Sequence, residues 1–287
     1  MKKYICILAF GLLALGGCRR SSMTPDEAGK NLGNEVSFTA ASAQFVTRAT
    51  DSALENGDQV GIFALEPVSR VNVKASVNGN KLVPEDPIKW GLRQRVENRF
   101  IAYLPYRATL SDTELEFSVQ SDQRQWNSYS ASDLRLSIVD AEPENEVHFL
   151  FQHVMSKLIV VTTGARVESI TTADPVIVGA SVDLVSNQLD VTALKSVIQL
   201  GKAVSGNGGE GYVCILPPQS GLFPLKVKTS DGRTINCTLE KPATFESGFA
   251  YRADIEIPGQ GTKDVTFKVN VVDWADDGTL SFQKTRF

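Results

Sequence analysis

The chain has 287 residues, with 29 basic and 33 acidic side chains and a formal net charge of −4. This acidic balance excludes the basic surface with which proteins bind nucleic acid. Hydrophobic residues make up 42% of the chain, which is enough to bury one or two cores at this length.

The first residues predict an export signal. Two lysines precede an apolar run of twelve residues at 4–15, which is shorter than the about 20 residues of a membrane-spanning helix. The run ends in LGGC at 15–18, which resembles the lipobox of bacterial lipoproteins, where the cysteine is lipidated. We therefore expect a signal peptide at residues 1–17 and a lipid on Cys18 that anchors the protein to a membrane. Removal of the signal takes away two lysines and no acid, so the net charge becomes −6.

Short β-rich runs bounded by Gly, Pro, Asn and Asp recur along the rest of the chain. This pattern is typical of a β-sandwich or barrel, and we predict an all-β protein. Asn-Gly at 78–79 and Asp-Gly at 231–232 and 277–278 predict tight turns. A helix is expected at 190–200 or near 125–134. The predicted strands cover residues 36–38, 59–65, 72–77, 99–104, 115–120, 147–151, 157–163, 176–184, 212–216, 224–228, 234–240, 251–257 and 265–272.

Two of the four cysteines remain once the export segment is processed. Cys214 and Cys237 both lie in predicted strands of one apparent meander. An exported protein can form a disulfide between them, and the alternative is two separate buried thiols.

The sequence contains little that indicates a catalytic or metal-binding site. His148 and His153 are five residues apart, so they would lie on different faces of a strand or of a helix. No cysteine or acidic neighbour completes a set of metal ligands with them. The glycine-rich segment 205–211 lacks the Lys-Ser/Thr of a phosphate-binding loop. The acids of 273–278 do not follow the alternate spacing of an EF-hand. We therefore expect no metal, no cofactor and no enzyme activity.

Four landmarks in order carry a family resemblance. FVTRAT at 45–50 is followed by NGDQVGIF at 56–63. FIAYLPY lies at 100–106, FQHVMSKL at 151–158, and a late tryptophan at Trp274. Together with the lipobox, these segments resemble the fimbrillin family of Bacteroidetes, whose members are stalk, tip, accessory and anchor subunits of pili.

The resemblance implies a fold of two transthyretin-like Greek-key β-sandwich domains in tandem. It divides the chain into a signal at 1–17, a lipidated tether with a removable first strand at 18–48, an N-terminal sandwich at 49–156 and a C-terminal sandwich at 157–287. The lipid on Cys18 would hold the protein on the outer membrane. The protein would then enter a surface pilus.

The resemblance also implies maturation by an arginine-specific protease. The matching bond here joins Arg48 and Ala49, and its cleavage would free the first strand. Val36 and Phe38 alternate as inward-facing residues of that removable strand. A C-terminal segment of a neighbouring subunit would fill the groove, by strand addition. The alternative is a permanent strand and an ordinary loop arginine, as in an anchor subunit that does not polymerise.

The expected partners are other pilus subunits and a receptor on a host or bacterial surface. A second hypothesis is a lipid-anchored protein that binds glycans. Aromatic side chains stack on sugar rings, and a platform could come from Trp90, Trp126, Tyr103, Tyr106 and Tyr129. The simpler reading of these five residues is that they belong to cores and turns.

Overall fold

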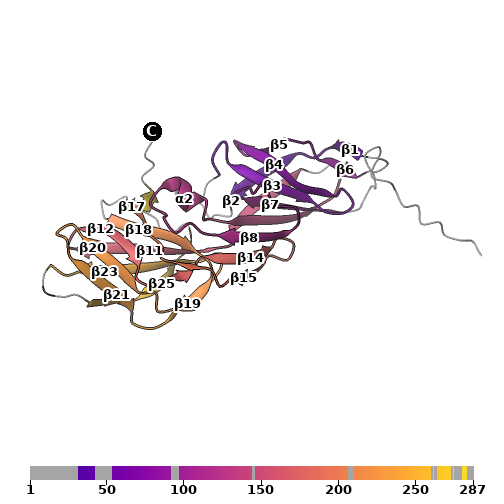
Figure 1. Cartoon of the computed structure of the whole chain (residues 1–287). Coiled ribbons are helices and arrows are strands. Elements are labelled where there is room, and N and C mark those ends of the chain that lie inside the picture. Colours follow the sequence, from indigo (N-terminus) through magenta and orange to yellow (C-terminus); the bar gives the residue numbers. More distant parts are fainter. Residues whose placement is uncertain are drawn as a thin grey trace, which may run out of the picture.

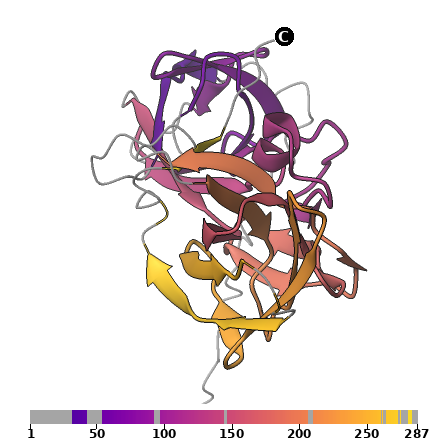
Figure 2. The same cartoon turned by 90° about the vertical axis from the view of Figure 1, so that its left-hand side faces the viewer.

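The computed structural model describes residues 32–42, 54–91, 97–143, 146–205, 210–259, 264–272 and 280–282, together with residues 261 and 274. Strands dominate these residues, so the prediction of an all-β protein is confirmed. The strands form two lobes, one from the first half of the chain and one from the second, and the lobes lie side by side in both views (Figures 1 and 2).

Seven strands of the first lobe close a barrel in the order β10-β2-β5-β4-β3-β7-β9. A separate two-stranded sheet pairs β1 with β6. The bounds are β1 Leu32–Glu35, β2 Phe38–Ser42, β3 Gln59–Ala64, β4 Arg70–Asn78, β5 Lys81–Pro84, β6 Lys89–Gly91, β7 Asn98–Leu104, β9 Arg135–Ala141 and β10 Val147–His153.

Alternation of apolar and polar residues explains which way the barrel strands face. In β10, Val147, Phe149 and Phe151 are buried, whereas the residues between them are exposed. Successive side chains of a strand point to opposite faces, so one face of β10 lines the barrel interior. These three residues belong to the hydrophobic cluster inside the barrel.

The second lobe contains two larger sheets. One has six strands in the order β25-β23-β11-β18-β17-β26, and the other has four in the order β12-β20-β21-β24. Their bounds are β11 Ser156–Gly164, β12 Val167–Thr172, β17 Gly201–Ser205, β18 Glu210–Leu216, β20 Leu225–Thr229, β21 Thr234–Leu239, β23 Ala250–Ile257, β24 Asp264–Phe267, β25 Val269–Val272 and β26 Leu280–Phe282.

Three small sheets complete the fold. β13 pairs with β16, β19 pairs with β22, and β15, β14 and β8 form a three-stranded sheet. The bounds are β8 Glu114–Ser118, β13 Val176–Ile177, β14 Gly179–Asp183, β15 Gln188–Val191, β16 Lys195–Ser196, β19 Gln219–Gly221 and β22 Ala243–Phe245.

Strand β8 connects the two lobes. It belongs to the first half of the chain but pairs antiparallel with β14 of the second half over five residues. Its residues Leu115 and Phe117 are buried in the larger hydrophobic cluster, which contains most of the second lobe. β11 begins at Ser156, beside the boundary expected there, and the division into two domains at that residue stays a prediction.

The helix and turn predictions have separate outcomes. Helix α2 spans Trp126–Ser130, so the expectation near 125–134 is confirmed. A helix at 190–200 is wrong, because that segment contains the end of β15 and all of β16. Gly79 and Gly232 have positive φ angles of 62° and 86° at the two described turns, as tight turns require. The turn at 277–278 lies outside the described residues.

Candidate functional site

Strand β2 closes the barrel of the first lobe. It pairs in parallel with β10 over five residues, from Phe38 opposite Val147 to Ser42 opposite Phe151. On its other side it pairs antiparallel with β5, where Phe38 lies opposite Leu82. In the described part of the chain, β2 is therefore the strand that joins β10 to β5. Its departure would open the barrel along one seam.

Phe38 anchors β2 in the barrel core. Its side chain is 2% exposed. The ring contacts Phe100 edge-to-face at 5.5 Å between centroids and stacks on Phe149 at 5.8 Å. Trp90 also contacts Phe100 edge-to-face, at 5.4 Å between centroids. The site of Phe38 is therefore an aromatic pocket, in which such contacts add to the free energy of burial.

The neighbours of Phe38 fix the position of the strand. Val36 and Ala40 are also buried, two residues before and after it. The Val36 amide donates a hydrogen bond to the Ile88 carbonyl at 2.8 Å, and the Ala40 amide donates one to the Asn80 carbonyl at 2.8 Å. Val36 precedes the start of β2, so the strand lies slightly later than predicted. Val36 and Phe38 face inward as their alternation indicates, and their release stays a prediction.

The outer face of β2 is polar. Thr39 lies opposite His148 in the parallel ladder, and its Oγ1 is 3.0 Å from Nδ1 of that histidine. Ser37 donates a hydrogen bond of 3.5 Å to Glu146. The contact of Ser37 is exposed and contributes little to stability, whereas Thr39 is itself buried and its contact with His148 is partly buried. The strand is therefore held by its ladders and by its buried face.

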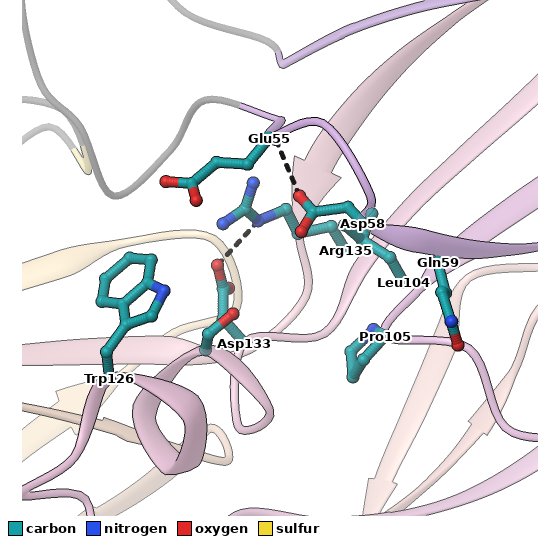
Figure 3. A pocket seen from close by; sticks show the side chains of 9 residues that line it. Glu55, Asp58, Gln59, Leu104, Pro105, Trp126, Asp133 and Arg135 are labelled. Carbon is teal, nitrogen blue, oxygen red and sulfur yellow. Dashed lines mark hydrogen bonds and ion pairs between the residues drawn. The ribbon is translucent and has the colours of Figure 1, made fainter. Parts of the chain in front are cut away.

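A buried ionic network lies where the barrel meets α2. One carboxylate oxygen of Asp133 accepts a hydrogen bond from Arg135 Nε at 2.7 Å. The other oxygen forms a hydrogen bond with His153 Nδ1, also at 2.7 Å. Figure 3 shows Arg135 between Asp133 and Glu55, beside a polar pocket of about 60 Å³. Burial alone would raise the pKa of Asp133, but the charges of Arg135 and His153 outweigh it and lower the pKa to about 2. The carboxylate thus stays ionised and pairs with Arg135.

The same network holds the start of the C-terminal segment. The Trp274 ring stacks on His153 at 3.9 Å between centroids with an interplanar angle of 14°. Lys157, which is fully buried, places its ammonium 5.8 Å from the Trp274 centroid. His153 ends β10, so one strand contacts β2 at one end and Trp274 at the other.

A sequence profile of fimbrillin-like proteins matches residues 47–274. The chain belongs to the fimbrillin-like family. A proposed fimbrium subunit of Bacteroides uniformis, Fim1C, is 27% identical over 221 residues, which cover 72% of this chain and 69% of that protein.

Solved structures show the same fold. A proposed cell adhesion protein of Bacteroides uniformis has a TM-score of 0.66 at 20% identity, covering 84% of this chain and 99% of that one. Another from Bacteroides ovatus has a TM-score of 0.65 at 17% identity, covering 84% and 98%. At these identities the likeness concerns the fold.

Two of the fimbrillin-like landmarks meet in space. Gly61 of NGDQVGIF pairs with Tyr103 of FIAYLPY between β3 and β7. A Cβ on Gly61 would collide with the Tyr103 ring, so the ring lies directly over the glycine. The Tyr103 hydroxyl donates a hydrogen bond to Asn72 Oδ1 at 2.8 Å. The glycine is thus required by the packing of the tyrosine.

Several predicted sites of this fimbrillin-like chain fall outside the described residues. These are the lipidation site Cys18 and the cleavage site at Arg48 and Ala49, which therefore stay predictions.

The cysteine pair is described: Cys214 in β18 and Cys237 in β21 are buried free thiols on different sheets. The structure therefore has the two-thiol alternative rather than the disulfide. Burial raises the pKa of Cys214 to about 12 and that of Cys237 to about 11.

The aromatic platform for glycans is not formed. Trp90, Tyr103 and Tyr129 are buried, and they divide between the two hydrophobic clusters. A side chain inside a core cannot stack on a sugar ring in solvent. The two other members, Trp126 and Tyr106, are partly buried against the larger cluster.

Other site expectations concern metals and membranes. The described residues contain no group of three His, Cys, Asp or Glu that could hold a metal ion. No helix in the described ranges has the length and apolar character to span a bilayer. Sequence reasoning missed the network of Asp133 and Arg135, whose signal was an aspartate and an arginine two residues apart at the start of the segment DLRLSIVDA at 133–141.

Proposed function

We propose that this fimbrillin-like chain is a structural or tip subunit of a cell-surface pilus that serves adhesion. The subunit is exported as a lipoprotein, cut after Arg48, and polymerised by strand exchange. One observation carries the proposal: β2 joins β10 to β5, and the chain that follows it leads directly to Arg48. Cleavage there separates β2 covalently from the rest of the fold.

The physical consequence of losing β2 supports polymerisation. β10 would lose a five-residue parallel ladder, and the barrel core would lose Phe38 from its aromatic pocket. Unpaired backbone groups beside apolar surface bind any strand of matching pattern, which is β-augmentation. A strand from a neighbouring subunit would restore both the ladder and the core. The family resemblance assigns this role to a C-terminal segment.

The remaining parts of the proposal concern fold and location. Two transthyretin-like Greek-key sandwiches would form the subunit, which is consistent with the two lobes and two hydrophobic clusters. The lipid on Cys18 would hold the precursor on the outer membrane before it enters the pilus. The subunit would act without catalysis or cofactor, by contacts with other subunits and with a surface receptor.

The test uses the full chain with Cys18→Ala, which keeps it free of lipid. Limited digestion with an arginine-specific protease is followed by mass spectrometry and by gel electrophoresis without heating. We expect one early cut after Arg48 and then a ladder of oligomers. The matched control is Arg48→Ala, which should remain uncut at this site and monomeric. Scattered cuts and a persistent monomer would contradict strand release, and would favour a non-polymerising anchor subunit.

A further inference from the structure

The chain contains three Asn-Gly pairs, at 56–57, 78–79 and 207–208, and the structure describes the first two. An asparagine before glycine is prone to deamidation, because glycine has no side chain to hinder its own amide nitrogen. That nitrogen attacks Cγ of the asparagine and forms a cyclic imide, and ammonia leaves with the proton that the nitrogen loses. Water then opens the imide to aspartate or isoaspartate. Both described pairs are exposed, so water reaches them.

The two described pairs contact each other. The Gly79 amide donates a hydrogen bond to Asn56 Oδ1 at 2.6 Å. The Gly57 amide donates one to the Val77 carbonyl at 2.9 Å. The nitrogen that would attack is therefore engaged in a hydrogen bond in both pairs, and for Gly79 the acceptor is the side chain of the other asparagine.

The turn that carries Asn56 is held in place by its own backbone. The Glu55 amide donates to Asp58 Oδ2 at 2.8 Å, and the Asp58 amide donates to the Glu55 carbonyl at 3.0 Å. The Val77 amide donates to the Asp58 carbonyl at 2.9 Å. These bonds fix the turn against the end of β4, so Asn56 stays within reach of Gly79.

We propose that Asn56 protects Asn78 from deamidation, and that Asn78 is the residue modified when this contact opens. For the attack, the Gly79 nitrogen must lose its proton and turn toward Cγ of Asn78. The acceptor oxygen of Asn56 opposes both steps, because it stabilises the protonated nitrogen and fixes the direction of the N–H bond. This protection is independent of the proposed function.

The position of Asn78 gives the modification a structural consequence. Asn78 ends β4, and the turn after it leads into β5, where Leu82 lies opposite Phe38 of β2. Isoaspartate adds one carbon to the main chain, so it would shift the register between β4 and β5. Because β5 is the antiparallel partner of β2, the same change would disturb the seam that closes the barrel. Asn56 therefore preserves this seam.

Timed incubation of the full chain with Cys18→Ala at mildly alkaline pH tests the proposal. Peptide mass spectrometry and labelling by an isoaspartyl methyltransferase measure the reaction at Asn78. We expect it to be about five- to tenfold faster in folded Asn56→Ala, which is the effect of one lost hydrogen bond. Asn56→Asp keeps an acceptor oxygen and should retain the protection. The matched control is Lys81→Ala, an exposed change in the same hairpin.

Three results would overturn the proposal. These are an unchanged rate at Asn78 in Asn56→Ala, an equal acceleration in Lys81→Ala, and a loss of protection in Asn56→Asp. Amide hydrogen exchange at Gly79 gives a second readout, and it should be faster in Asn56→Ala than in the wild type. If Asn56→Ala fails to fold, the wild type decides, because Asn78 must react more slowly in the native protein than in urea.

Discussion

Replacing Phe38 by alanine tests whether β2 is a stabilising part of the uncut subunit. The side chain is 2% exposed and contacts the rings of Phe100 and Phe149 at 5.5 and 5.8 Å. Truncating a buried phenylalanine typically lowers the free energy of unfolding by about 3–5 kcal/mol. Because burial here is nearly complete and two aromatic contacts are lost, we expect a value within that range.

The assay is urea unfolding of the uncut full chain with Cys18→Ala. The matched control is Val83→Ala on the neighbouring strand β5, where the side chain is 51% exposed. That change should stay within about 0.5 kcal/mol, because surface substitutions rarely cost more. A loss below about 1 kcal/mol for Phe38→Ala would refute the reasoning, since it would mean that the aromatic pocket does not depend on this ring.

The same variant also tests whether β2 is absent from the polymer. If β2 leaves on cleavage, Phe38 is absent from the mature subunit, and its replacement cannot affect the polymer. Phe38→Ala should therefore destabilise the uncut chain while its ladder dissociates at the same urea concentration as the wild-type ladder. A ladder weakened by Phe38→Ala would show that β2 remains in the assembled subunit.

Three further predictions concern the described cores. The pKa of Asp133 is about 2 in the folded protein, below its ordinary value of 3.8. Its ionised carboxylate therefore stabilises the fold above about pH 4, and this stabilisation is lost as the pH falls toward 2. Asp133→Asn should remove this pH dependence from the free energy of unfolding, measured in urea across that range. Burial raises the pKa of Cys214 and Cys237, so neither thiol should react with a thiol-specific dye in the native protein, and dithiothreitol should not change the melting temperature. Gly61→Ala should lower the free energy of unfolding by about 1–3 kcal/mol, because the new Cβ collides with the Tyr103 ring.

Controls separate these effects from general damage. Asp140→Asn alters an exposed ion pair with Arg99, and it should change the acid dependence less than the loss of the buried carboxylate does. Both thiols should react once the protein is unfolded in urea. Gly259→Ala places its Cβ in open space and should leave stability nearly unchanged. A rapid native reaction of either thiol, or equal effects of the two glycine variants, would contradict the packing described above.

Local sequence pattern predicted much of the fold because it depends on neighbouring residues. The alternation in β10 and the Asn-Gly turn after β4 were predictable for this reason. β9, with the sequence RLSIVDA, was missed because it directly follows the α2 region, where a helix was expected up to residue 134. The helix expected at 190–200 failed because pairing of β15 with β14 overrides the local pattern.

Pairing between strands that are far apart in the chain could not be predicted from the sequence. Phe38 was predicted to face a core, but its parallel partner Val147 lies 109 residues away and no local signal specifies that register. The same limit applies to the pairing of β8 with β14 across the expected domain boundary. The sequence left two questions open, namely whether the five aromatic residues belong to a glycan platform or to cores, and whether the two cysteines form a disulfide or stay separate thiols. Only the tertiary fold decides which side chains are buried and which sheets they belong to.

Amide hydrogen exchange of residues 147–151 tests the central claim most directly. Alternate amides of this strand point toward β2, as the hydrogen bond from the Val147 amide to the Ser37 carbonyl shows, so exchange at Val147, Phe149 and Phe151 should be slow in the uncut chain. The Leu150 amide donates to Ser137 of β9 instead and serves as an internal control. Exchange should become fast in freshly cut monomer, when β2 has left, and slow again in the ladder, when a strand from a neighbour has replaced it. Exchange that is slow in all three states would contradict the account, because it would mean that the barrel never opens at this seam.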